Sequence, residues 1–293
     1  MRLSRSVGRG VRAAVVGVAV VAVIGACGGQ HGSGTAVAFT ARTPGGMVPS
    51  AGTMEQTKQA VEQRAGTLGV GKTTVTVDAD MLTITVAGDD GTAARRLGRS
   101  GRLLLRPVLA GKPFQAGPGK TLPGKDVRQS LDPAVQTATL AGIDCKQPDP
   151  LRGADDATLP LVTCAAAGDT AYLLGPAVVD GKELTDAKGS MDTRTARYGV
   201  NLTLTDIGVR QYTQYTATNV GKQLAFEVDS QVLSAPVIQS DVLTSQSGFG
   251  PVIPSAVLGN QSQLVGNFTK DAADDIATTL RLGALPAILT PRG

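Results

Sequence analysis

The pattern of apolar and polar positions in the first half of the chain predicts a small unit of strands and helices. Residues 35–41 alternate as a half-buried strand does, and two further alternating runs, 75–77 and 82–86, are joined by a short acidic turn, which predicts a hairpin. A short helix at 92–97 and an apolar strand at 103–105 follow. With a longer helix between the first strand and the hairpin, the order is β-α-β-β-α-β, which predicts the ferredoxin-like split βαβ fold.

The longer helix of this unit has recognisable start and stop signals. Thr53 and Gln56 have the spacing of a capping box, which places the helix start there. Gly69 or Gly71 ends the helix, because glycine readily adopts the left-handed conformation that follows a last turn. One face of the helix is apolar, and it consists of Met54, Val61, Ala65 and Leu68.

The second half of the chain repeats a β-α-β-β order. A strand ending at Leu204 is followed by a helix that Thr205 caps, and a hairpin then turns at Asp229. The final helix begins at Thr269, and aspartates in its first turns favour the positive end of the helix dipole. Residues 245–262 show no regular pattern. The chain is therefore predicted to be α+β throughout.

Residues 109–170 separate the two halves, are rich in Gly and Pro, and contain Cys145 and Cys164. An even pair of cysteines in an exported protein predicts a disulfide, and this one closes a loop of about 19 residues, which stabilises the fold by about 3 kcal/mol in the chain-entropy model. The loop has little apolar material for a core of its own. Two free thiols remain the alternative.

The N-terminus has the layout of an export signal. Four arginines precede an uncharged apolar run at 13–26, which is about 14 residues long and therefore shorter than the roughly 20 residues that span a bilayer. Residues 24–27, Ile-Gly-Ala-Cys, resemble the bacterial lipoprotein signal, whose cysteine carries a diacylglycerol group. The resemblance implies a signal peptide over 1–26 and a lipidated Cys27 on a short tether over 27–33. A plain signal peptide with an incidental cysteine is the alternative.

Charge and composition argue against several classes of function. The four arginines of residues 1–26 equal the formal net charge of +4, so the mature chain is neutral and lacks the basic surface that nucleic acid binding needs. Aromatic residues make up 3% and Trp is absent, which disfavours stacking platforms. The single histidine, His31, lies in a Gly/Ser stretch, which disfavours a His-based metal site or a Ser–His–Asp triad.

Two patterns that look like functional motifs do not predict a binding or catalytic site. Residues 66–73 satisfy G-x-x-x-x-G-K-[ST], but a helix precedes them and a strand follows, which is the reverse of a phosphate-binding loop. Paired aspartates at 89–90, 155–156 and 274–275 fall where solvated turns or helix starts are predicted. We therefore predict no nucleotide, cofactor or metal site, and no enzymatic activity.

A series of short segments along the chain shares one resemblance. The segments include Asn-Leu-Thr-Leu at 201–204, Asp-Ser-Gln-Val-Leu-Ser-Ala-Pro at 229–236, Gly-Asn-Phe-Thr at 266–269, Leu-Arg-Leu-Gly-Ala-Leu-Pro-Ala at 280–287 and, in the first half, Ala-Arg-Thr-Pro at 41–44 and Leu-Arg-Pro-Val at 105–108. In this order they resemble the first large extracytoplasmic domain of SecD, an accessory subunit of the bacterial Sec preprotein translocase. The resemblance covers roughly residues 34–288.

The resemblance implies a base at 34–108, a connector at 109–170, a head at 171–267, and a return helix with a C-terminal tail at 268–293. In the family the head swings and is thought to touch the emerging polypeptide. SecD also has transmembrane helices whose charged residues conduct protons, whereas here a lipoprotein signal stands first and the chain stops at Gly293. We therefore expect the shared soluble domain without a proton-driven motor.

Our leading hypothesis is a non-enzymatic lipoprotein on the extracytoplasmic face of the bacterial cell membrane, held there by its lipid anchor. It would bind exported polypeptide or Sec translocase subunits, by adding an extended chain to the exposed edge of a hairpin. The alternative is a structural envelope lipoprotein that has kept the fold without a role in translocation. The residues predicted to bind polypeptide are Asp229, Val232, Ser234, Pro236 and Asn267.

Overall fold

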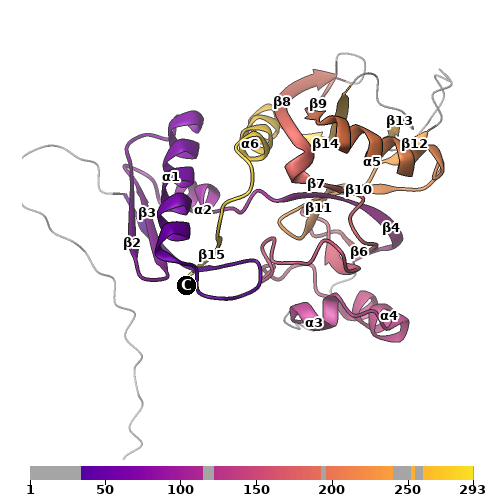
Figure 1. Ribbon diagram of the computed structural model, residues 1–293, viewed down its shortest axis with the longest axis horizontal. Helices are drawn as coiled ribbons and strands as arrows, with labels where there is room; N and C mark the ends of the chain where they lie inside the picture. The colour runs from indigo at the N-terminus through magenta and orange to yellow at the C-terminus, as the bar shows by residue number, and fades with distance from the viewer. Residues whose placement is uncertain (1–33, 115–121, 193–195, 240–251, 255–259, 293) are drawn as a thin grey trace, which may run out of the picture. The chain divides into compact units, whose positions relative to one another are not determined.

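A computed structural model describes residues 34–114, 122–192, 196–239, 252–254 and 260–292 (Figure 1). Several mostly antiparallel sheets and a few helices confirm the predicted α+β class. Cys27 and its tether lie outside the described residues. The helices are α1 (Ala51–Leu68), α2 (Thr92–Leu97), α3 (Lys125–Arg128), α4 (Pro133–Gly142), the 3-10 turn η1 (Gly181–Glu183), α5 (Asp206–Ala217) and α6 (Lys270–Arg281).

Within the described residues the strands form four separate sheets. The first two have the orders β15-β1-β3-β2 and β11-β10-β4-β6-β5, with β7 beside β4 in the second. The other two are β14-β9-β8 and the short pair β12-β13. The strands are β1 (Ala36–Arg42), β2 (Thr73–Asp78), β3 (Met81–Val86), β4 (Leu103–Pro113), β5 (Leu161–Cys164), β6 (Thr170–Leu174), β7 (Val179–Asp180), β8 (Leu184–Asp192), β9 (Arg197–Leu204), β10 (Leu224–Val228), β11 (Gln231–Ser234), β12 (Val237–Gln239), β13 (Val252–Pro254), β14 (Gln261–Phe268) and β15 (Ile288–Pro291).

We call the sheet β15-β1-β3-β2, with α1 and α2, the base. The predicted hairpin is present as β2 and β3, but the strand predicted at 103–105 is not in this sheet. Its expected place beside β1 is taken by β15, which arrives from the far end of the chain and appears in yellow among the indigo strands of Figure 1. Residues 103–105 are buried on both faces of their strand, so they need cover on both sides, and the edge of the base sheet does not provide it.

The helix α1 begins earlier than the sequence predicts. Its N-cap is Ser50, whose hydroxyl accepts the N–H of Thr53 at 3.1 Å, so the predicted cap lies inside the first turn. The helix ends at Gly69 with a φ of 62°, as predicted. Its buried side chains pack on the sheet in one apolar cluster, which includes Phe39, Met54, Val61, Ala65, Leu82 and Ile84.

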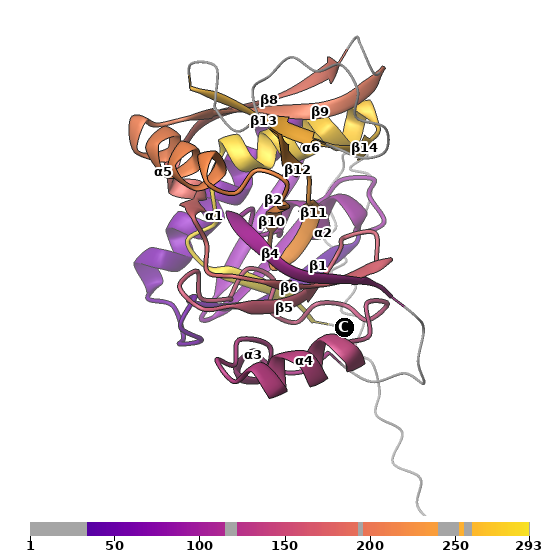
Figure 2. The same cartoon turned by 90° about the vertical axis from the view of Figure 1, so that its right-hand side faces the viewer.

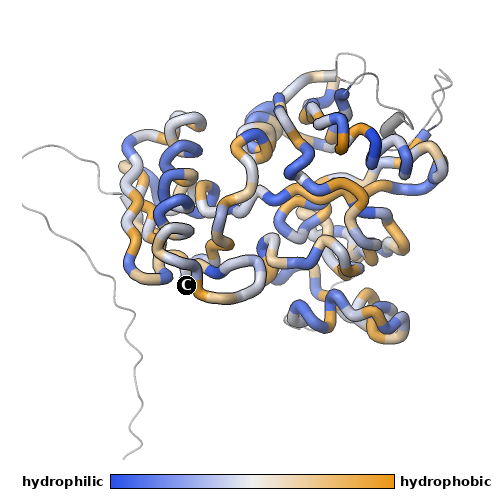
Figure 3. The backbone as a smooth tube through the Cα atoms, in the orientation of Figure 1, coloured by the Kyte–Doolittle hydropathy of each residue, from blue (hydrophilic) through white to orange (hydrophobic). Residues whose placement is uncertain are grey.

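We call the sheet β11-β10-β4-β6-β5 with β7 the central sheet, and β14-β9-β8 the head sheet. The predicted second β-α-β-β unit is therefore divided, because β9 lies in the head sheet and the hairpin β10–β11 in the central sheet. The apolar residues of β4 pair with β10. Figure 3 shows these paired strands as a largely hydrophobic stretch of the tube. A shared core joins the two sheets with α5 and α6, and it includes Leu103, Leu105, Val200, Leu202, Tyr212, Phe226 and Leu264.

The helix α6 belongs to this shared core. Thr269 caps it, as predicted, by accepting the N–H of Ala272 at 3.2 Å. Its buried face consists of Ala273, Ala277 and Leu280. The return to the base is made by the segment after the helix, whose Leu285, Ala287 and Leu289 lie in the base core. The residue bounds of base and head implied by the resemblance stay a prediction.

The connector between β4 and β6 holds α3, α4 and β5, and Figure 2 shows the two helices below β5 and β6. A disulfide joins Cys145 and Cys164, with their Sγ atoms 2.06 Å apart. Both cysteines are buried in a small cluster with Ile143, Val162 and Ala171. The segment predicted to be irregular, 245–262, falls mostly outside the described residues.

Candidate functional site in the head and at its junction with the base

Three of the five side chains predicted to bind polypeptide are buried. Val232 is 2% exposed and Ser234 is 8% exposed. Pro236 is buried, and Asp229 is half-buried at the turn between β10 and β11. Asn267, on β14, is exposed. The three buried residues support the fold, and their side chains offer no surface to a passing chain.

The backbone of the predicted hairpin edge is also engaged. The carbonyl of Val232 accepts the N–H of Ala166 at 2.9 Å, which covers the outer side of β11 at that point. Asp229 accepts the N–H of Arg102 at 2.9 Å and so ties the turn to the start of β4. The hairpin edge is therefore an internal contact where strand addition was expected.

A buried ion network lies beneath this turn. Arg106 on β4 donates to Glu227 on β10 at 3.1 Å and to Asp155 in the connector at 2.6 Å, and all three side chains are inaccessible to solvent or nearly so. Ser230 bridges the two acids, because its N–H donates to Glu227 at 2.6 Å and its hydroxyl hydrogen-bonds Asp155 at 2.7 Å. The remaining donors of Arg106 reach the carbonyls of Asp156, Leu159 and Gly175.

The two acids of this network share one cation. Burial, and then the charge of Asp155, raise the pKa of Glu227 to about 8, against the lowering effect of Arg106. The shift favours the protonated form of Glu227, because two ionised carboxylates beside one guanidinium would leave a buried net charge. The network joins two strands to the connector.

The sequence contains a signal for this network. Arg106 interrupts the apolar run from Leu103 to Val108, and Glu227 interrupts the apolar strand β10. A charged residue within a run that is buried on both faces needs a partner of opposite charge. What the pattern leaves open is which acid supplies it, since Asp155 comes from a Gly- and Pro-rich segment without periodicity.

A second buried arginine stands where the chain passes between the base and the rest of the fold. Arg64 on α1 is 2% exposed and donates to the carbonyls of Arg99, of Ser100 at 2.9 Å, and of Gly283 at 2.6 Å. These carbonyls belong to the two crossing segments, one leading into β4 and the other leading out of α6. The two segments also bond to each other directly, from the N–H of Leu285 to the carbonyl of Ser100 at 2.8 Å.

Burial and the charge of Asp229 have opposite effects on the pKa of Arg64 at this crossing. Burial lowers the pKa of Arg64 to about 10, with the charge of Asp229 acting against that shift, so the side chain stays charged at neutral pH. Burial raises the pKa of Asp229, while N–H donors and the nearby Arg64 lower it. Asp229, predicted to contact polypeptide, thus sits among the arginines of the junction.

Other contacts at the junction are more exposed. Arg96 on α2 pairs with Asp275 on α6 at 2.8 Å, with about a third of each side chain in solvent. Arg152 of the connector donates to the carbonyl of Leu289 on β15 at 2.8 Å. A cavity of about 380 Å³ opens beside the crossing, and its lining includes Pro44, Gly101, Leu103, Lys182, Leu282 and Ile288.

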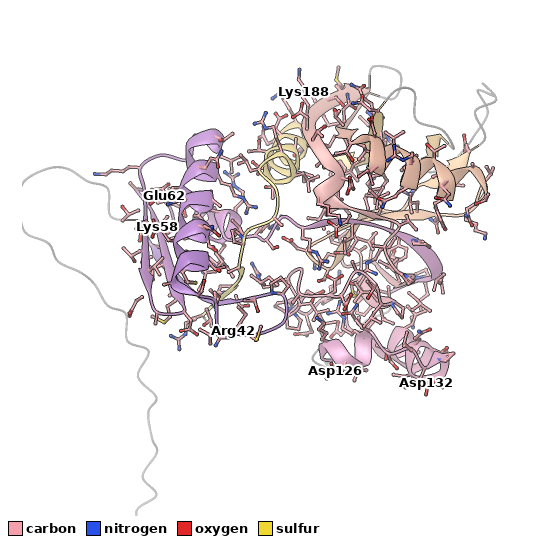
Figure 4. All side chains as sticks on the ribbon, in the orientation of Figure 1. Arg42, Lys58, Glu62, Asp126, Asp132 and Lys188 are labelled. Carbon is pink, nitrogen blue, oxygen red and sulfur yellow. A yellow bond between two sulfur atoms is a disulfide. The ribbon has the colours of Figure 1, made fainter. Side chains whose placement is uncertain are left out.

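The outward face of the head sheet carries a row of polar side chains. The hydroxyl of Ser190 on β8 hydrogen-bonds Asn201 on β9 at 3.0 Å, and Gln263 on β14 donates to the same Asn201 oxygen at 3.1 Å. Alternation along β9 points its buried neighbours Val200 and Leu202 to the core, so this row faces away from it. Figure 4 labels Lys188, an exposed residue of β8 that pairs in register with Asn201.

A metal-binding cluster is not found in the part of the chain that the structure covers. Across the described ranges, no three His, Cys, Asp or Glu side chains lie close enough to hold a metal ion. No described helix is both long and apolar enough to cross a bilayer. The segment 66–73 lies at the end of α1 and the start of β2, the order that the sequence predicted and that a phosphate-binding loop lacks.

Comparison with known proteins gives these features a context. Residues 160–287 match the family model described as SecDF, P1 head subdomain. The chain is 32% identical to the protein translocase subunit SecD of Mycobacterium tuberculosis H37Rv, in an alignment that covers 88% of this chain and 56% of the relative. It is SecD-like.

Two further relatives of this SecD-like chain match shorter stretches. The protein translocase subunit SecDF of Thermus thermophilus is 34% identical over 40% of this chain and 14% of its own length. SecD of Acetobacter pasteurianus is 35% identical over 38% of this chain and 19% of its own length. The chain spans little more than half the length of the Mycobacterium relative and much less of these two.

Solved structures agree at the level of the fold. A structure titled as a membrane component SecDF that enhances protein export is 22% identical and superposes with a TM-score of 0.51, over 88% of this chain and 98% of that one. The crystal structure of SecDF in its super-membrane-facing form gives a TM-score of 0.53 at 22% identity, over 89% of this chain and 30% of that one. The chain therefore shares the fold of these SecDF structures.

Proposed function

We propose that this SecD-like chain is a non-enzymatic accessory of Sec-dependent protein export, held at the extracytoplasmic face of the cell membrane by lipid on Cys27. The observation that carries the proposal is the resemblance to SecD along 88% of the chain, with the head region matched by its own family model. The relatives are translocase subunits by name, so a partner related to the translocase follows for this chain as a hypothesis.

The polypeptide contact is better supported on the outward face of the head sheet than at the hairpin first predicted. Asn201 and Gln263 present amide groups in a row there, and exposed Asn267 lies on the same strand as Gln263. Amides and hydroxyls can bond the backbone of an extended chain without selecting its side chains. A binder of many exported proteins needs that tolerance.

Site-specific photo-crosslinking tests this contact. A crosslinker at Gln263 or Asn267, in cells arrested during export, should capture exported polypeptide or Sec subunits. The matched control is a crosslinker at Glu62, an exposed residue of α1 in the base, which should capture neither. Equal capture from all three positions, or from none, would contradict the assignment to the head sheet.

Binding strength and its salt dependence follow from the charge of the mature chain. We expect micromolar or weaker binding of an unfolded exported protein, about −8 kcal/mol or less favourable. The affinity should change little between low and high salt, because the chain without residues 1–26 is neutral. No binding at millimolar client by a folded protein would favour the alternative, a structural envelope lipoprotein.

The lipid anchor has its own test. Replacement Cys27→Ser should release the protein from the membrane fraction, because two acyl chains hold a protein stably at a bilayer. Mass spectrometry of the wild-type N-terminus should find a diacylglycerol-modified cysteine. An unmodified mature N-terminus upstream of Cys27 would refute the anchor and leave the head-sheet proposal untouched.

A further inference from the structure

The edges of the sheets differ in how they are protected. An exposed, regular edge strand invites pairing with another chain, and folded proteins usually cover or interrupt such edges. In this protein β5 is covered because the carbonyl of Val162 accepts Arg128 at 2.8 Å, and β15 because that of Leu289 accepts Arg152. The edge of β11 is covered by Ala166. The registers of β8 and β14 are each interrupted by a shift.

In the described part of the chain, strand β2 has neither a covering contact on its outer edge nor a register shift. It is the end strand of the base sheet, its register with β3 runs unbroken over six pairs, and no described strand pairs with its outer side. Its sequence, Thr-Thr-Val-Thr-Val-Asp, contains no proline or lysine and consists mostly of β-branched residues. Thr74, Thr76 and Val77 are exposed.

The hydrogen-bond pattern of the hairpin fixes which groups face outward. The carbonyl of Lys72 accepts the N–H of Ala87 at 2.9 Å, so residue 72 bonds toward β3. Bonding alternates along an antiparallel pair, and therefore the N–H and C=O groups of Thr73, Val75 and Val77 point to the free side. The side chains of the even-numbered positions lie on the face opposite buried Val75.

We propose that two copies of this chain pair through β2, antiparallel about a two-fold axis at Val75. Only the register that sets Val75 against its own copy uses all three outward-facing residues, because Thr73 then meets Val77 on both sides of the axis. The same register sets Lys72 of each copy opposite Asp78 of the other copy, which gives two pairs of opposite charge. Thr74 falls opposite Thr76. Maximal backbone bonding and charge complementarity thus select one register, and the product is a continuous sheet of eight strands.

The charges needed for this pairing are free to take part. Lys72 and Asp78 are both exposed, and within the described ranges neither forms an ion pair. In the paired register they occupy non-hydrogen-bonded positions, where side chains of opposite strands come closest. Isologous contact of this kind closes after two copies and leaves no further β2 edge. The pairing is separate from the polypeptide contact proposed on the head sheet.

Reversing the charges of Lys72 and Asp78 in the full chain tests the proposed register of β2 against its copy. Sedimentation of the purified chain in detergent, over a series of concentrations, should show a reversible dimer. Replacement Lys72→Asp or Asp78→Lys should each weaken the association at least tenfold, since two like-charge contacts replace two attractive ones. The double replacement should restore it. Lys188→Asp, the same charge change at an exposed strand residue of the head, is the matched control and should leave the dimer intact.

Each other outcome would overturn the proposal. A monomer at every concentration excludes self-pairing. A dimer that the charge exchanges do not weaken forms through another surface. If the chain stays monomeric but the single exchanges weaken binding of an unfolded polypeptide, β2 receives a client strand instead. Because the exchanged side chains are exposed, circular dichroism and thermal unfolding should match the wild type at concentrations where both are monomeric, which separates these outcomes from misfolding.

Discussion

The base and the central sheet bury their residues by different means. The base core consists of apolar side chains on strands and a helix that mostly follow one another along the chain. The central sheet joins segments from distant parts of the chain, and charged side chains lie between them, among which Arg106 and Arg128 are fully buried. The comparison shows that a segment rich in Gly and Pro, as the connector is, can be held by ion pairs and a disulfide where it lacks an apolar face.

Arg128 illustrates this second means. Its guanidinium donates to both carboxylate oxygens of Asp149, at 2.7 and 2.9 Å, and to Val162 and Thr163 of β5. A bidentate arginine of this kind orders a loop that has few apolar contacts. The base has one comparable residue, Arg64, and it serves the crossing to the central sheet, while the base interior has no buried ion pair among its described residues.

The largest expected effect comes from removing the cation of the central network. Arg106→Met should destabilise the fold by about 3–5 kcal/mol, because it leaves two buried acids, Glu227 and Asp155, without a cation. Urea unfolding measures the change. Arg96→Met, which removes a partly exposed pair, is the matched control and should cost about 1 kcal/mol or less. Similar losses from both variants would remove the distinction between network and surface pair.

Loss of the connector disulfide should come next. Reduction, or Cys145→Ser with Cys164→Ser, should lower stability by about 3 kcal/mol through the entropy of the unfolded loop. The base should be little affected, because its core shares no residue with the cysteine cluster. Hydrogen exchange with and without reductant would show this as faster exchange in α4 and β5 than in β1 and β3. Two reactive thiols in the unreduced, denatured protein would contradict the bridge.

The junction should respond to Arg64→Lys by about 2 kcal/mol. Lysine keeps the charge but cannot reach the carbonyls of Arg99, Ser100 and Gly283 with one planar fork. Exchange of the amide of Leu285, which bonds across the crossing, should accelerate more than that of amides inside α1. If Leu285 stays protected, the crossing is held by other contacts.

The pH dependence of stability should show the most specific effect, because it follows from a single carboxyl group. The pKa of Glu227 is raised to about 8, so between about pH 4.5 and 8 the folded state keeps a proton that the unfolded state has released. Stability therefore falls as pH rises through that window, with a slope of up to about 1.4 kcal/mol per pH unit from this group. Glu227→Gln should flatten the profile there. An unchanged profile would show that Glu227 is ionised in the folded protein.

How far the fold could be predicted differs between the same two regions. In the base the alternation of 75–77 and 82–86 located the β2–β3 hairpin, and Gly69 marked the end of α1. The missed element was β15, because nothing local at residues 288–291 shows that they pair with β1. In the second half the caps Thr205 and Thr269 were placed correctly, but the sheet to which each strand belongs was not.

The candidate site was less predictable than the fold. Val232, Ser234 and Pro236 are buried because β11 contacts the connector, and no periodicity in residues 109–170 predicted that contact. The sequence did not indicate that Arg64 is buried either, because an arginine on a helix is usually solvated. Its partners are backbone carbonyls, which every residue possesses.

By itself the sequence determined the α+β class, the helix caps Thr205 and Thr269, and the hairpins β2–β3 and β10–β11, since these depend on residues within a few positions of one another. Its segments also carried the resemblance to SecD. Only the tertiary structure decided that β15 closes the base, that β4 leaves it, and that Arg106 finds Asp155 and Glu227. These pairings join residues far apart in the chain, and their partners are selected by packing and by the cost of burying charge, which no local pattern encodes.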